Sequence, residues 1–195
     1  MNWMTDEAWS LCWLLAFTLL LGWASASDVR SGRVSNVLVG AGLLAGLLLS
    51  ATPAGVGLLS ALAGAAIGLL ALMPLYLLRM MGAGDVKLLS AVGAFVGYPS
   101  IVGVTLAMFV AGGGLALAWA IRYGLTAQVL RNLRRGLRSV VTAPMLPGSL
   151  ASRLSMPVSS MRIPYAVAIA AAGAVYLWRS ERLDAAWNLA RHALA

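Results

Sequence analysis

Two aspartates are the residues of this chain whose type and position best suit chemistry. Asp28 lies in SDVRSGRVSN, directly after a long apolar run, and Asp85 lies in GAGDVKLL, directly before another. A carboxylate beside a membrane span is costly to keep there, so each is a candidate for a functional site. The chain has six acidic residues. The remaining acids lie in the terminal segments, where a solvated charge needs no special role: Asp6, Glu7, Glu181 and Asp184.

Two carboxyl groups brought together from separate helices can hydrolyse an amide. Like-charge repulsion raises one pKa, so one member keeps its proton while the other is ionised. The ionised member takes a proton from water as the water attacks a peptide carbonyl, and the protonated member polarises that carbonyl or protonates the leaving nitrogen. The alternative is simple pairing with Arg30, Arg33 or Lys87, but charges one or two positions apart do not face each other on a helix.

Residues for other hydrolytic mechanisms are missing from the sequence. The single histidine, His192, is far along the chain from both acids, and the single cysteine, Cys12, lies inside an apolar run. This leaves no cluster of zinc ligands and no Ser–His pair near the acids. We therefore expect no metal and no other cofactor.

Composition indicates that these acids belong to a membrane protein. Of the 195 residues, 61% are hydrophobic and 10% are charged, whereas soluble domains carry about 25% charged residues. Mean hydropathy is +0.88. We predict a single domain over residues 1–195 with an all-α fold, a polytopic bundle of about six transmembrane helices. The apolar segments that predict these spans lie at about residues 9–27, 36–52, 55–78, 86–98, 100–121 and 163–178.

Basic residues predict the orientation of this bundle. With the N-terminus outside, eleven of the fourteen Lys and Arg residues fall in inner loops, as the positive-inside rule requires. Both termini then lie outside, and both aspartates lie at the cytoplasmic face. The net charge of +8 indicates contact with anionic lipid rather than with nucleic acid, because the basic residues lie beside membrane spans.

The longest inner loop, residues 122–162, contains AQVLRNLRRGLRSVV. Its apolar and basic residues alternate at helical spacing, which predicts an amphipathic helix on the inner membrane surface, in contact with anionic lipid. A solvated loop and a partner-binding helix are the alternatives.

Glycines and alanines have two predicted roles. Gly82 and Gly84 precede Asp85 and lack side chains where the backbone must come close to something, either an extended substrate strand or the other aspartate. Small residues elsewhere recur at four-residue spacing, which predicts close helix packing in lipid. They are Gly57, Ala61 and Ala65, and Gly64 and Gly68. The consecutive Gly112, Gly113 and Gly114 predict close packing as well.

The two aspartate segments together resemble a known family. GAGDVKLLSAVGAFVG is similar to the G-x-G-D motif of the type IV prepilin peptidases, which are intramembrane aspartic proteases of bacterial pilus and type II secretion systems. DVRSGRVSN resembles their first-aspartate motif, with Val34 and Ser35 where Ile and Pro are usual and with Asn36 matching. RIPYAVAIAAAG resembles their final span. The resemblance covers most of the chain and is closest to the small, peptidase-only branch associated with tight-adherence (Flp) pili.

The resemblance implies an aspartic endopeptidase of the bacterial inner membrane. Such an enzyme cleaves the short basic leader of prepilin-like precursors at the cytoplasmic face, typically after a glycine. Carried across, Asp28 and Asp85 are the catalytic pair, and Gly82 and Gly84 shape the active-site loop. Lys87, Arg30 and Asn36 are the expected supports. The cysteine-bearing domain of larger members, which also N-methylate the new pilin end, is not expected here, so no methyltransferase activity is implied.

Two other classes of function remain open from the sequence. A small proton- or cation-coupled carrier would use the two acids as a relay. Carriers usually show inverted repeats and an acid near the bilayer midplane, whereas this chain has no detectable repeat and both acids fall at one face. An inactive assembly factor that binds pilin would keep the fold but would not need both aspartates. The number of subunits is not predicted.

Overall fold

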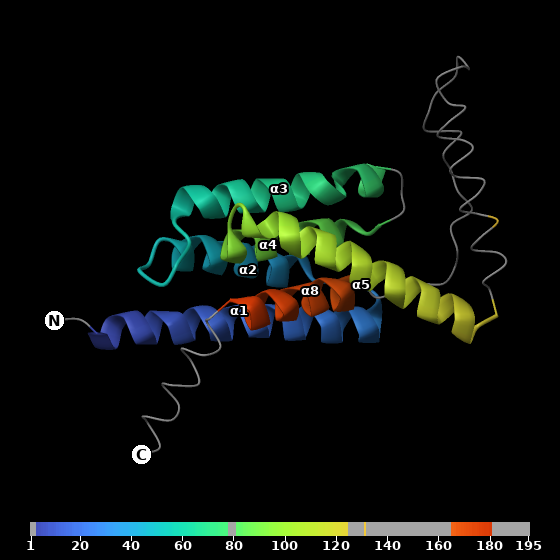
Figure 1. Cartoon of the computed structure of the whole chain (residues 1–195), viewed down its shortest axis with the longest axis horizontal. Helices are drawn as coiled ribbons and strands as arrows, with labels where there is room; N and C mark the ends of the chain where they lie inside the picture. The colour runs from blue at the N-terminus through green and yellow to red at the C-terminus, as the bar shows by residue number, and fades with distance from the viewer. Residues whose placement is uncertain (1–2, 78–80, 125–130, 132–164, 181–195) are drawn as a thin grey trace, which may run out of the picture.

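The computed structural model describes residues 3–77, 81–124, 131 and 165–180, and these form an all-helical bundle (Figure 1). The predicted all-α fold is confirmed, because no strand occurs in the described ranges. The helices, in chain order, are α1 (Trp3–Ser31), α2 (Asn36–Ser50), α3 (Leu58–Leu77), α4 (Ala83–Val96), α5 (Ser100–Arg122) and α8 (Tyr165–Arg179).

The described helices fall on the apolar segments of the sequence. By length and composition, the stretch Ala8–Ser31 of α1, together with α3 and α5, could cross a membrane. Helices α2 and α8 are apolar but shorter. The count of six crossings therefore stays a prediction. The predicted amphipathic helix of the 122–162 loop lies almost wholly outside the described residues.

The chain runs up and down through the bundle, so successive connections lie at alternate ends. The link from α1 to α2 and the start of α4 lie at one end, together with the start of α8 (Figure 1). We call this the aspartate end, because Asp28 and Asp85 both lie there. The turns at 51–57 and 97–99 lie at the opposite end, as does the first turn of α1.

Helix α4 is the centre of the bundle and contacts all five other described helices. Nearly every residue from Asp85 to Val96 is buried, which explains why the segment is apolar or small on all sides rather than on one stripe. Its 14 residues extend over only about 21 Å. Because protein surrounds it, α4 does not need the length of a helix that faces lipid.

Aromatic side chains from α1 pack on this central helix. The Trp13 and Phe17 rings stack with centroids 5.0 Å apart, and both lie against Phe95, at 5.6 and 5.4 Å. Tyr176 of α8 meets Phe17 edge-on at 6.5 Å. These contacts join α1, α4 and α8, the three helices that carry the polar groups of the aspartate end.

Glycines let α3 lie directly against α4, as their four-residue spacing predicted. A methyl group at Gly64 would overlap the carbonyl oxygen of Gly93, and one at Gly68 would come within 2.6 Å of the Leu89 oxygen. Ser90 donates a hydrogen bond to the Ala65 oxygen across the same interface, at 2.9 Å. Gly57 was wrongly assigned to this packing: it precedes α3, has a φ of 86° and meets nothing within 4 Å.

Candidate active site

The end of α1 presents Asp28 to the start of α8. The helix ends at Ser31 because Gly32 adopts the left-handed region, with φ 62°, and its N–H donates to the Asp28 carbonyl oxygen at 2.8 Å. The carboxylate Oδ2 of Asp28 accepts a hydrogen bond from the backbone N–H of Ala166, at 3.0 Å. The Ser25 hydroxyl donates to the Ala166 carbonyl oxygen at 3.4 Å. The backbone N–H and C=O of Ala166, in the first turn of α8, are thus both hydrogen-bonded to α1.

Asp85 lies in the first turn of α4 and is only 9% exposed. Its backbone N–H donates to the Gly82 carbonyl oxygen at 3.2 Å. A β-carbon at Gly82 would lie 3.4 Å from Asp85 Oδ2, in contact with the carboxyl group. One at Gly84 would lie 3.3 Å from the Val34 β-carbon, in the α1–α2 link. Gly82 thus lies beside Asp85 and Gly84 beside the α1–α2 link, whereas the predicted approach to a substrate strand or to Asp28 stays a prediction.

The two carboxyl groups interact electrostatically. Burial and, to a smaller extent, the charge of Asp28 together raise the pKa of Asp85 from its ordinary value of 3.8 to about 6. A hydrogen bond from the Gly82 backbone opposes part of this shift. Asp85 precedes the apolar segment at 86–98, so it titrates at the mouth of the bundle. The arrangement therefore has one carboxyl group that keeps its proton into the mildly acidic range, beside a second carboxyl group.

Two of the expected supports contact each other. The Lys87 ammonium donates to the Asn36 side-chain oxygen at 3.0 Å. This bond links the first turn of α2 to α4 just beyond Asp85. The bond thereby connects the two sequence segments that carry the aspartates. Asn36 is the last residue of SDVRSGRVSN, which contains Asp28, and Lys87 follows Asp85 in GAGDVKLL.

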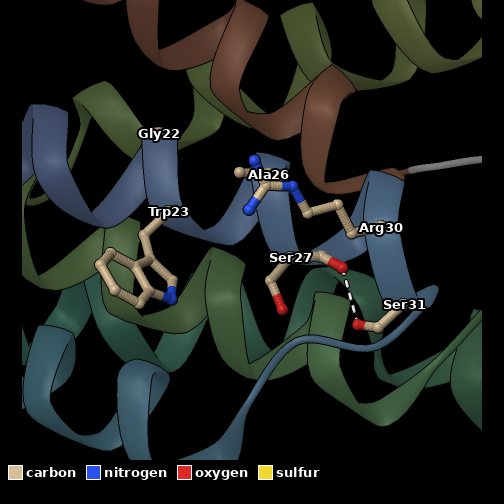
Figure 2. A pocket seen from close by; sticks show the side chains of 6 residues that line it. All are labelled: Gly22, Trp23, Ala26, Ser27, Arg30 and Ser31. Atoms are coloured by element: carbon tan, nitrogen blue, oxygen red, sulfur yellow. Dashed lines mark hydrogen bonds between the residues drawn. The ribbon is translucent and has the colours of Figure 1, made fainter.

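Arg30, the remaining expected support, lies elsewhere. It is exposed and lines a cavity on one face of α1 (Figure 2). Asp28 lies two positions earlier on the same helix, which turns the two side chains to different faces. A role for Arg30 at the aspartates stays a prediction that no contact in the described ranges supports.

The sequence did not identify two groups of α8 that meet the aspartates. One is the Ala166 N–H that binds Asp28. The other is Tyr165, a half-buried residue whose phenol interacts electrostatically with Asp85. Pro164, directly before them, is a sequence signal for a helix start. Such a proline can signal a helix N-terminus with free N–H groups, but it does not show which acid would receive them.

The described residues also contain no group of three or more His, Cys, Asp or Glu side chains close enough to hold a metal ion. The polar groups that do converge at the aspartate end are the two carboxyl groups, the Tyr165 phenol and the Ala166 amide.

A bundle of apolar helices with two interacting carboxyl groups at one end defines a class of helical membrane protein built around paired acids. The particular family follows from comparison with known families. The model of the type IV leader peptidase family matches residues 15–117, more than half of the chain, and the chain belongs to this family. The match includes Asp28 and Asp85 and ends before α8. No curated protein and no solved structure gives a significant match.

Membership of this family makes the protein a membrane peptidase that acts on a protein substrate. It favours the peptidase interpretation over the carrier and over the assembly factor, because a leader peptidase needs both a hydrolytic site and access to a membrane-bound precursor.

Proposed function

We propose that the protein is an aspartic endopeptidase that removes the short basic leader of prepilin-like precursors, with Asp28 and Asp85 as its catalytic dyad. It acts in the bacterial inner membrane, with the aspartate end at the cytoplasmic face and both termini outside. It is a peptidase of the type that serves Flp-like pili, and it does not methylate its product. The observation that carries the proposal is that the charge of Asp28 acts on a buried Asp85 whose pKa is raised to about 6.

The mechanism requires one acid of the pair to be protonated and the other to be ionised. Asp85 holds a proton and donates a hydrogen bond to the scissile carbonyl, and Asp28 removes a proton from the attacking water. Water oxygen adds to the carbonyl carbon, giving a tetrahedral intermediate. The leaving nitrogen then takes from Asp28 the proton that came from the water, as the carbonyl re-forms and the C–N bond breaks. This yields a carboxyl end on the leader and an amino end on the mature protein, and it leaves Asp85 protonated and Asp28 ionised.

Backbone features support this division of roles. The Ala166 N–H holds one oxygen of Asp28, which fixes the direction of the base relative to Asp85. Gly82 contributes no side chain beside the Asp85 carboxyl group. A peptide bond inside a helix is shielded, so the substrate must be extended where it is cut, and Gly82 adds no side chain that would obstruct such a strand.

The Lys87–Asn36 hydrogen bond has a positioning role in this scheme. It ties α2 to α4 and so maintains the distance between the segments that carry the two acids. Neither side chain is proposed to touch the reacting atoms.

The test is cleavage of a prepilin with a glycine-ended basic leader by purified wild-type protein, Asp28→Asn and Asp85→Asn. Each variant is first checked for a native thermal transition. We expect each substitution to lower kcat at least about 100-fold, since each removes a proton-transfer group. Asp184→Asn, in the C-terminal tail, is the matched control and should cleave at the wild-type rate. Full activity in either folded dyad variant would refute the proposed mechanism.

A further inference from the structure

We infer that the face of α1 turned away from Asp28 carries a binding site for the phosphate of an anionic phospholipid, with Arg30 as its cationic group. The inference is independent of the peptidase chemistry, since it concerns the opposite side of the helix. It assigns to Arg30 a partner that the catalytic scheme does not provide.

The site is a cavity of about 470 Å³ lined by two adjacent rows of α1. Gly22, Ala26 and Arg30 make one row and Trp23, Ser27 and Ser31 make the other, each at four-residue spacing, so all six share one helix face (Figure 2). Gly22 and Ala26 form a low floor, and a β-carbon at Gly22 would meet nothing within 4 Å. The walls are the long side chains of Trp23 and Arg30.

Arg30 is the cationic group of the cavity, and its exposed side chain is available to bind an anion. Figure 2 shows its side chain turned back along α1 toward Ala26, which directs the guanidinium away from the helix end and toward the apolar part of the helix. No ion pair of Arg30 occurs within the described ranges, and the nearest acid along the helix, Asp28, binds the Ala166 amide instead. The planar guanidinium binds a bidentate anion such as phosphate through paired hydrogen bonds.

The two serines that line the cavity, Ser27 and Ser31, do not supply hydrogen-bond donors to an anion. The Ser27 hydroxyl donates to the Arg33 carbonyl oxygen at 2.8 Å, and the Ser31 hydroxyl donates to the Ser27 carbonyl oxygen at 2.7 Å. Their hydrogens are thus used within the chain, which leaves Arg30 as the only cationic donor among the lining residues, beside the neutral indole N–H of Trp23. A basic leader peptide would be repelled by this site, so the substrate of the proposed reaction is not the occupant.

A row of exposed apolar side chains on α1, here called the apolar track, indicates that the anion is the headgroup of a lipid. Trp23 is 68% exposed, and Leu19 and Leu15, one and two turns deeper on α1, are also exposed. A phosphate held by Arg30 would therefore continue into acyl chains that run along these side chains. Tryptophan at the level of the headgroups is typical of the membrane interface, and basic pockets beside membrane helices bind anionic headgroups. Free phosphate would use Arg30 alone and gain nothing from the track.

Native mass spectrometry of the full chain tests the site, with phosphatidylglycerol and phosphatidylcholine supplied in equal amounts in detergent. We expect wild type to retain phosphatidylglycerol preferentially and Arg30→Gln to lower that retention about tenfold, as for a lost charge-assisted hydrogen bond. Arg33→Gln is the matched control: Arg33 is exposed and three positions away, but it does not line the cavity. Equal loss in both variants would mean a general effect of positive charge and would overturn the site.

Two further measurements do not depend on the folding of Arg30→Gln. Excess inorganic phosphate should leave the bound phosphatidylglycerol in place, and displacement of the lipid would identify free phosphate as the ligand instead. Brominated phosphatidylglycerol should quench wild-type fluorescence more than brominated phosphatidylcholine does, and the difference should disappear in Trp23→Phe. An unchanged difference in Trp23→Phe would place the lipid elsewhere and refute the inference.

Discussion

At the scale of single residues, the raised pKa of Asp85 predicts how cleavage depends on pH. The protonated form of Asp85 is the proposed acid, and it is lost as pH rises through about 6. We therefore expect kcat/KM to fall about tenfold for each pH unit above that value. The measurement is initial rates of precursor cleavage across pH 5 to 8 in one detergent, on a substrate without titratable side chains beside the scissile bond.

Two other titratable groups lie close enough to Asp85 to influence this profile. Asp28 on α1 and Tyr165 on α8 both interact with Asp85. Tyr165→Phe removes the phenol and keeps the ring, so a descending limb near pH 6 should persist in this variant. A rate that is flat from pH 5 to 8 in the wild type would contradict the assignment of Asp85 as the acid.

The Lys87–Asn36 pair allows a second prediction at this scale. Asn36→Asp keeps the acceptor oxygen of the 3.0 Å hydrogen bond and adds a favourable charge, so we expect near wild-type cleavage. Asn36→Leu removes the acceptor and should lower kcat about tenfold through misplacement of the two acids, with little effect on KM. Equal kcat values for the two variants in the cleavage assay would show that the contact has no positioning role.

At the scale of elements, the close contact between α3 and α4 depends on glycines, which have no side chain to separate the two helix backbones. Gly64→Ala would place a methyl group on the Gly93 carbonyl oxygen, so the helices must separate. We expect a loss of about 1–3 kcal/mol, as for overpacked cores, seen as a lower melting temperature in detergent. Gly113→Ala on α5 is the control, because its β-carbon would meet nothing within 4 Å. That variant should match or slightly exceed wild type. Comparable losses in both would refute this account of the interface.

The sequence predicted the role of some of these glycines correctly and the role of others wrongly. The four-residue spacing of Gly64 and Gly68 correctly indicated a helix contact, because packing in lipid selects small residues. The same reasoning failed at Gly57, where a positive φ before α3 is the reason for glycine. A pattern of small residues does not distinguish a packing position from a turn, because both kinds of position favour a residue without a side chain.

The same limit applies to the candidate site. Asp28 and Asp85 could be selected from the sequence because acids beside apolar segments are rare. The Ala166 N–H could not be selected, because every residue except proline has one and only the tertiary arrangement brings this one to Asp28. Arg30 lies within two residues of Asp28, but helical geometry turns it to the opposite face.

At the scale of the whole molecule, the up-and-down path puts the α1–α2 link and the α2–α3 turn at opposite ends. The basic residues predict that the former, with the aspartates, faces the cytoplasm. The lone cysteine makes this testable, since Cys12→Ser provides a background without thiols. Ser35→Cys then marks the aspartate end, at a helix start where the serine side chain makes no cap, and Ala51→Cys marks the other end.

We expect a membrane-impermeant maleimide to label Ala51→Cys in intact cells expressing the protein and to label Ser35→Cys only after the membrane is opened. Both positions are exposed, so a difference reports the side of the membrane rather than burial. Labelling of Ser35→Cys alone in intact cells would reverse the orientation and place the dyad outside, where it would not meet a cytoplasmic leader. Labelling of both would contradict the up-and-down path itself, because a bundle with its ends on opposite sides of a bilayer cannot expose both to one reagent.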